Sequence, residues 1–171
     1  MNVGKVFEDD FKASVPKEYY TVRLNDPAVG FSGGSSQFAP KNPYDFIVFA
    51  KVMHCLELKS SGGAITFWQE RFELDGKKRT YDIRKHQIKG LTEAATHENV
   101  YAGLLLNFRG KGVTVYVPID RFNAWAAETS KKSINAQDAL GLGFPVDSRK
   151  LKVHYRYDIS KMCEEVVALG K

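Results

Sequence analysis

The chain has 171 residues, of which 43% are hydrophobic and 26% charged, a composition typical of soluble globular proteins. Its apolar runs, such as residues 46–50, are far shorter than the roughly 20 residues of a membrane-spanning helix. Residues 1–13 are too charged for a secretory signal. We therefore expect one cytoplasmic domain over residues 1–171, with no membrane segment.

The net charge of +5 and the pI near 9.1 weakly favour a polyanionic partner. Acidic residues concentrate before position 100, whereas basic residues crowd the second half: Arg109, Lys111, Arg121, Lys131, Lys132, Arg149, Lys150, Lys152 and Arg156. An ordinary solvated surface explains this distribution equally well. Two cysteines in no recognisable spacing, Cys55 and Cys163, suggest neither a metal site nor a disulfide.

The first elements are read from apolar spacing. Residues 3–14 have the helical pattern of Val6, Phe7 and Phe11, and Pro16 stops the run. Residues 19–24 are rich in aromatic and β-branched side chains and predict a strand. The segment that follows is too rich in Gly, Ser and Pro to be a simple turn, so we expect a functional or flexible loop there.

The middle of the chain predicts paired strands and a helix. Residues 44–50 and 53–58 are apolar runs separated by only two residues, and they read as neighbouring strands, the second ending at Lys59. A turn is expected at 60–63. Residues 65–72 fit no single pattern, and 83–96 show helical spacing.

The second half predicts a hairpin and further helices. Residues 100–107 and 113–117 are strands joined by a glycine-containing turn. Asp120 is expected to cap a helix over 121–128. Residues 153–157 are expected as a strand, and Ser160 as the cap of a final helix. This order predicts an α/β domain with a central mixed β-sheet flanked by helices.

The chemically informative fragment is Asp45, followed twelve positions later by Glu57, Leu58 and Lys59. Because side chains alternate along a strand, Glu57 and Lys59 should share one face while Leu58 enters the core. If the strand that begins at Asp45 pairs with this one, Asp45 can lie beside Glu57. The sequence then places two carboxylates and an ammonium group within a few ångströms.

Two adjacent carboxylates repel each other unless a cation neutralises them. Oxygen ligands favour Mg²⁺, which binds one or two carboxylates, several waters and a phosphate, and which can polarise a phosphodiester. Lys59 could orient a water molecule or stabilise developing charge. The triplet is short and also arises by chance. A charged pair buried at the end of an apolar strand would nevertheless destabilise the fold, which favours a functional role.

In these residues the chain resembles the PD-(D/E)xK nuclease superfamily, and more narrowly the RecU-type Holliday-junction resolvases of Gram-positive bacteria and their phages. The matching segments are Asn-Val-Gly-Lys-Val-Phe-Glu at 2–8, Tyr-Asp-Phe at 44–46, Glu-Leu-Lys at 57–59, Thr-Phe at 66–67 and His-Gln-Ile at 86–88. Their order and spacing carry the resemblance, which spans roughly residues 2–125.

The resemblance implies a restriction-endonuclease-like fold and a homodimer that nicks four-way DNA junctions symmetrically with Mg²⁺ or Mn²⁺. Asp45 and Glu57 would be the metal ligands and Lys59 the catalytic lysine. Glu8 would be an auxiliary acidic residue, unless it is only a surface residue of its helix. Gln87 would be a motif glutamine near the scissile phosphate. The compact length favours a phage version.

The chain also departs from that family. Val3 stands where the family has an arginine, so a DNA contact there is lost or supplied by Lys5. The segment 26–43 replaces a longer projection that enters the junction, and we expect a flexible loop or short stalk. Its candidate DNA contacts, unless it is a plain surface loop, are Phe31, Phe38 and Lys41, and Arg109 and Lys111 are candidates elsewhere.

Two alternatives stay open. The chain could be another PD-(D/E)xK nuclease, acting on duplex or single-stranded DNA, or a DNA-binding module that keeps the fold without cleaving. The intact set of Asp45, Glu57 and Lys59 argues against the second alternative.

Overall fold

A computed structural model of the chain describes residues 3–24, 41–74 and 79–170. Its centre is a mixed sheet whose strands lie in the order β1-β2-β3-β5-β6-β8. The strands are β1 (Tyr20–Arg23), β2 (Phe46–Phe49), β3 (Met53–Ser61), β5 (Val100–Phe108), β6 (Val113–Pro118) and β8 (Phe144–Pro145). β3 and β5 are parallel, and the other neighbours are antiparallel. The predicted mixed sheet is confirmed.

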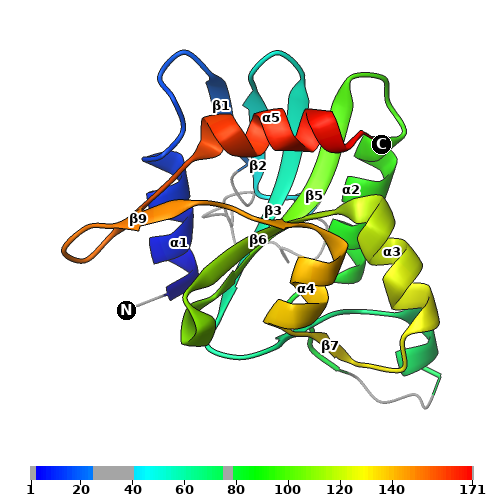
Figure 1. Cartoon of the computed structure of the whole chain (residues 1–171). Helices are drawn as coiled ribbons and strands as arrows, with labels where there is room; N and C mark the ends of the chain where they lie inside the picture. Colours follow the sequence, from blue (N-terminus) through cyan, green and yellow to red (C-terminus); the bar gives the residue numbers. More distant parts are fainter. Residues whose placement is uncertain (1–2, 25–40, 75–78, 171) are drawn as a thin grey trace, which may run out of the picture.

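Helices cover both faces of this sheet (Figure 1). They are α1 (Val3–Lys12), α2 (Lys85–Ala95), α3 (Ile119–Glu128), α4 (Ala136–Leu142) and α5 (Ile159–Leu169). Two short strand pairs lie outside the main sheet: β4 (Ile65–Thr66) with β7 (Ser133–Ile134), and β9 (Ser148–Lys150) with β10 (Tyr155–Tyr157). The described residues also include the 3-10 turns η2 (Glu70–Phe72) and η3 (Arg109–Lys111).

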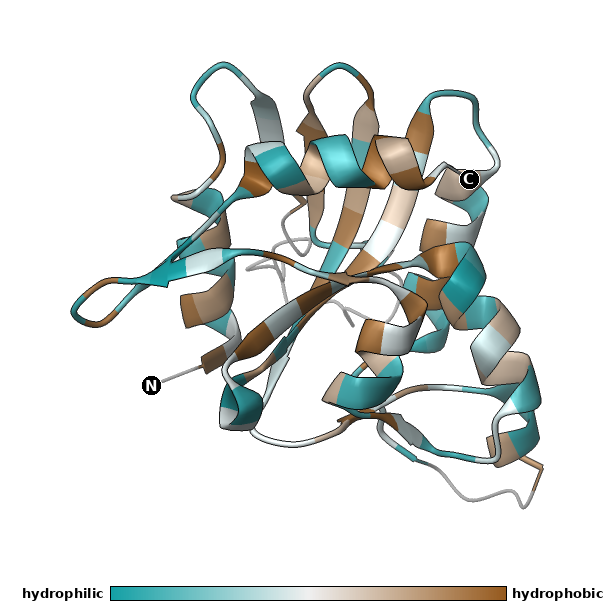
Figure 2. Ribbon diagram, viewed as in Figure 1, coloured by the Kyte–Doolittle hydropathy of each residue, from teal (hydrophilic) through white to brown (hydrophobic). Residues whose placement is uncertain are grey.

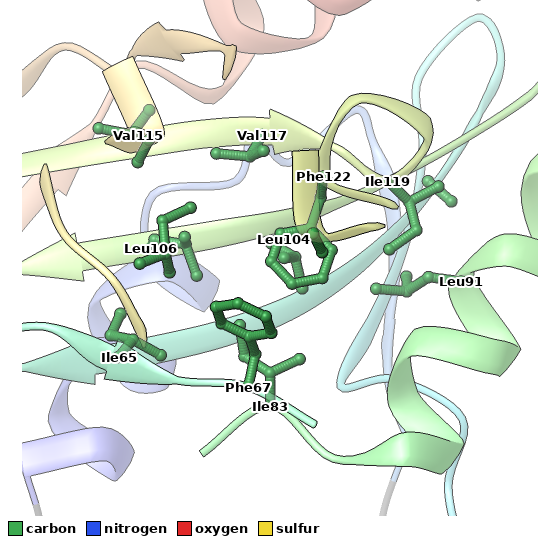
Figure 3. Packing of buried hydrophobic residues seen from close by; sticks show 14 of the residues in the cluster. Ile65, Phe67, Ile83, Leu91, Leu104, Leu106, Val115, Val117, Ile119 and Phe122 are labelled. Atoms are coloured by element: carbon green, nitrogen blue, oxygen red, sulfur yellow. The ribbon is translucent and has the colours of Figure 1, made fainter. Parts of the chain in front are cut away.

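The core has two layers because side chains alternate along the strands. One layer packs the sheet against α2, α3 and α4, and Figure 3 shows its side chains converging between the strands and these helices. The other layer packs the sheet against α1 and α5. On β5, Leu104 and Leu106 enter the first layer and Leu105 the second.

Three expectations about element ends were wrong. Asp120 does not cap α3, since the helix begins at Ile119 after Pro118, which offers no side-chain acceptor. Asp120 instead lies in the first turn, where its charge favours the positive end of the helix. Ser160 does not cap α5, because the side chain of Asp158 accepts from the N–H of Lys161. β3 does not end at Lys59 but runs to Ser61, where β5 still supplies a partner.

No helix within the described ranges is long and apolar enough to cross a bilayer. Phe31, Phe38 and most of the predicted 26–43 stalk lie outside the described residues. Lys41, at the end of that segment, is exposed.

Candidate functional site

The pairing of β2 with β3 brings Asp45 to Glu57. Phe46 lies opposite Leu56, so Asp45 reaches the level of Glu57 one position earlier. The N–H of Asp45 donates to the carbonyl of Leu56 at 3.0 Å. Its carboxylate Oδ2 accepts from the N–H of Leu58 at 2.9 Å. Asp45 is therefore held against β3 by both its backbone and its side chain, and the strand pairing that the sequence predicted is confirmed.

Alternation along β3 separates the charged side chains from the apolar ones. Leu56 and Leu58 belong to the layer with α1 and α5. Glu57 lies on the other face, where Gln87 of α2 reaches it. The predicted orientation of Glu57 and Leu58 is confirmed.

Glu57 is fully buried, and only one of its two carboxylate oxygens has a partner among the described residues. Nζ of Lys59 lies 2.5 Å from its Oε1, and Nε2 of Gln87 donates to the same oxygen. The second oxygen, Oε2, is buried and has no hydrogen-bond partner in the part of the chain that the structure describes. Burying a carboxylate oxygen without a hydrogen-bond partner costs free energy of folding. Such a group in a native structure calls for an explanation.

Burial raises the pKa of Glu57 to about 8, against the opposing attraction of the Lys59 ammonium. The negative charge of Asp45 raises this pKa further. Even with Lys59 beside it, the carboxyl thus holds its proton near neutral pH unless a metal cation also approaches. Shifts of this kind gather at functional sites, although structural ion pairs also cause them.

Gln87 is fixed at both ends of its amide. Its Oε1 accepts from the N–H of Arg84 at 2.8 Å at the start of α2, so its Nε2 is directed to Glu57. It is 8% exposed and hence part of the interior. The structure brings together four of the predicted site residues: Asp45, Glu57, Lys59 and Gln87.

Glu8 lies in an ion pair with Arg23 of β1, with Oε2 at 2.6 Å from Nη2. The neighbouring Leu24 donates its N–H to the carbonyl of Asp45 at 2.8 Å. Glu8 is thus linked to the site through β1. The sequence analysis did not single out Arg23, whose only signal was a cation ending a predicted strand.

The candidate DNA contacts in the described ranges are exposed: Lys5, Lys41, Arg109 and Lys111. Arg109 and Lys111 flank Gly110 in η3, which packs closely on the end of β3, since a Cβ on Gly110 would meet the carbonyl oxygen of Gly62. η3 therefore lies next to the chain just beyond Lys59.

The donor set fits magnesium. Within the described ranges no three His, Cys, Asp or Glu side chains are grouped to hold a metal. Mg²⁺ needs fewer, because it retains waters and is bound by one or two carboxylates together with substrate phosphate. Asp45 and Glu57 offer two carboxylates on one face, and the orphaned Oε2 of Glu57 is an acceptor that such an ion would satisfy.

No family model matches the chain. The chain is 29% identical over 181 residues to the SPbeta prophage-derived uncharacterized protein YotM of Bacillus subtilis (strain 168), across 97% of this chain and 87% of that protein. Among solved structures it is similar to Hjc, a Holliday junction resolvase from Archaeoglobus fulgidus, with a TM-score of 0.44 and 14% identity, across 82% of this chain and 90% of that one.

Proposed function

We propose that the chain is a divalent-metal-dependent endodeoxyribonuclease that resolves four-way DNA junctions, of the RecU type within the PD-(D/E)xK superfamily. The observation that carries the proposal is the arrangement on β2 and β3. Asp45 is fixed beside a fully buried Glu57, whose Oε2 makes no hydrogen bond in the described structure. Lys59 completes the set, with its Nζ 2.5 Å from Oε1 of Glu57.

In a purely structural role these residues would add little to the stability of the fold. A buried ion pair usually stabilises a fold no better than apolar side chains of the same volume. A half-satisfied one is worse, because the free oxygen has lost its water without gaining a partner. Binding of a cation that contacts a DNA phosphate would explain the arrangement of Asp45, Glu57 and Lys59.

Asp45 and Glu57 would hold Mg²⁺ or Mn²⁺, which supplies a Lewis acid for the phosphodiester and lowers the pKa of a bound water. Lys59 would stabilise negative charge that develops on the phosphate, or orient the attacking water. Gln87 would act as a positioning residue, since its amide holds one oxygen of Glu57 and leaves the other available. Glu8 would assist through its ion pair with Arg23.

Branched DNA and a homodimer are the finer part of the proposal. They are supported by the resemblance of residues 2–125 to the RecU-type enzymes, and by the prophage origin of the B. subtilis relative. The net charge of +5 suits a polyanionic substrate. Two symmetrical nicks require two active sites, one from each copy of the chain. The proposed dimer would act in the bacterial cytoplasm.

Three substrates test the proposal in one experiment. A synthetic four-way junction, a linear duplex and a single strand are each incubated with the chain and Mg²⁺. Paired symmetrical nicks in the junction, with little cutting of the other two, are expected. Degradation of the duplex or single strand would favour another nuclease of the superfamily, and binding without cleavage at any metal concentration would favour a DNA-binding module.

A further inference from the structure

The β9–β10 hairpin is a separate ribbon that belongs to no larger sheet. It projects beyond α1 at the side of the molecule in Figure 1. Its ten residues, 148–157, include four Lys or Arg and no Asp or Glu. Figure 2 shows mainly hydrophilic strands and a hydrophobic outer end, where Leu151 and Val153 are exposed.

One face of the ribbon is anchored to α1. The ring of Tyr157 packs edge-on against Phe7 at 5.5 Å between centroids. The N–H of Tyr155 donates to Oδ2 of the buried Asp10 at 2.9 Å, and Nδ1 of His154 lies 2.6 Å from its Oδ1. These contacts of His154, Tyr155 and Tyr157 fix the ribbon on α1.

The other face carries two arginines directly opposite each other. Arg149 and Arg156 are cross-strand partners in the antiparallel register, so their side chains leave the ribbon on the same side, away from the tyrosines. Like charges in opposed positions destabilise a strand pair. Among the described residues, neither guanidinium has a carboxylate in an ion pair, and the same holds for Lys150 and Lys152.

An anion between the arginines would turn this repulsion into attraction. Arginine binds phosphate through its planar fork of N–H donors, and a two-stranded ribbon is of a size that DNA grooves admit. A duplex presents phosphates in closely spaced rows. The charge and shape of this face therefore match a duplex backbone better than a single small anion.

The ribbon is also linked to the candidate nuclease site. α1 carries Asp10, which anchors the hairpin, and Glu8, which pairs with Arg23 beside the strand of Asp45. A cavity of about 250 Å³ between α1 and the hairpin is lined by Tyr155 and by Arg109 of η3. Arg109 thus lies across this cavity from the tyrosine face of the hairpin, next to the end of β3.

We propose that the β9–β10 hairpin binds the phosphate backbone of a DNA duplex arm through Arg149 and Arg156. The inference rests on the proposed function, because it names the surface by which the nuclease holds its substrate. It adds a binding element on the face of the sheet that α1 covers, outside the metal site.

The test measures binding of a linear duplex and of a four-way junction in EDTA, as a function of salt, without cleavage. The double variant R149Q/R156Q should make the slope of log K against log salt shallower by about 1.8, since each lost phosphate contact removes about 0.9. The matched control is K17Q/K51Q, which removes the same charge from exposed lysines outside the hairpin. It should change the slope far less.

Folding is checked on the same variants. R149Q/R156Q should melt at the temperature of the unaltered chain or above it, because a repulsive pair is removed. Arg149→Glu creates an attractive cross-strand pair with Arg156. It should raise the melting temperature while weakening DNA binding more than Arg149→Gln does.

The outcomes separate this proposal from the broader one. An unchanged slope in R149Q/R156Q, with DNA binding intact, overturns the role of the hairpin and leaves the nuclease proposal standing. Failure of the unaltered chain to bind either DNA overturns both. Loss of binding to phosphatidylserine vesicles in R149Q/R156Q, with DNA binding unchanged, would assign the hairpin to a membrane surface instead.

Discussion

Nζ of Lys59 lies 2.5 Å from Oε1 of Glu57, two residues away on the same strand. The side chain of Lys59 is 22% exposed, whereas that of Glu57 is fully buried. Lys59 is thus the one member of this pair that reaches towards solvent, where a phosphate would approach.

Lys59→Ala should reduce cleavage by roughly a hundredfold or more, because it removes the group that stabilises the charge developing on the phosphate. Folding should change little near neutral pH, because burial keeps Glu57 protonated there. Single-turnover cleavage and thermal unfolding are measured on the same preparation. Equal losses of activity and stability would indicate a structural ion pair.

Asp45→Asn should lose more than about a hundredfold in cleavage, since even groups that only orient metal ligands are worth 10–100-fold. The amide oxygen of asparagine can still accept from the N–H of Leu58, so the fold should remain. Junction binding in EDTA should be unchanged or tighter, because a negative charge near the phosphate is removed. Near-normal cutting by this variant would refute the metal site.

Gln87→Ala should lower cleavage by about 10–100-fold through a weaker affinity for the metal, seen as a higher Mg²⁺ concentration at half-maximal rate. The reason is that Nε2 of Gln87 holds Oε1 of Glu57. Gln69→Ala is a matched control, because Gln69 also donates its amide to a single partner, the carbonyl of Ala126. A parallel loss in both variants would point to general destabilisation.

The stability of the metal-free chain should depend on pH through Glu57. Its folded pKa of about 8 lies above the unfolded value of 4.5. Between these values the folded chain keeps a proton that the unfolded chain releases, so the free energy of unfolding falls as pH rises. The slope can reach about 1.4 kcal/mol per pH unit. Below 4.5 this contribution is fully present, and above 8 it is lost.

Denaturant unfolding from pH 5 to 9, with and without Mg²⁺, checks this expectation. Glu57→Gln should flatten the dependence, since the amide does not titrate. Added Mg²⁺ should stabilise the unaltered chain more at high pH, because the ligand must be deprotonated to bind. Stabilisation by Mg²⁺ that is equal at pH 5 and pH 9 would place the ion elsewhere.

The adjacency of Asp45 and Glu57 could be predicted because it needs only two rules, the alternation of side chains and the pairing of consecutive strands. The contact between Gln87 and Glu57 spans thirty residues and depends on how α2 packs on the sheet. Only the resemblance to a known family pointed to Gln87. The functional roles of all these residues stay predictions.

Other features escaped the sequence analysis for physical reasons. α4 has seven residues and two nearby glycines, too few positions for a helical apolar pattern to emerge. Its start did carry a signal, since Asn135 and Asp138 form a reciprocal cap. The anchoring of the β9–β10 hairpin by Asp10 joins residues 145 positions apart, and local periodicity contains no such information.

The hydrogen bond from Leu58 to Asp45 gives the site an internal reporter. The amide proton of Leu58 points at a carboxylate oxygen instead of a strand carbonyl, so its NMR chemical shift should respond to any change of charge on Asp45. Titration with Mg²⁺ should move this resonance at metal concentrations where cleavage begins. A backbone spectrum can therefore follow occupation of the site in the absence of DNA.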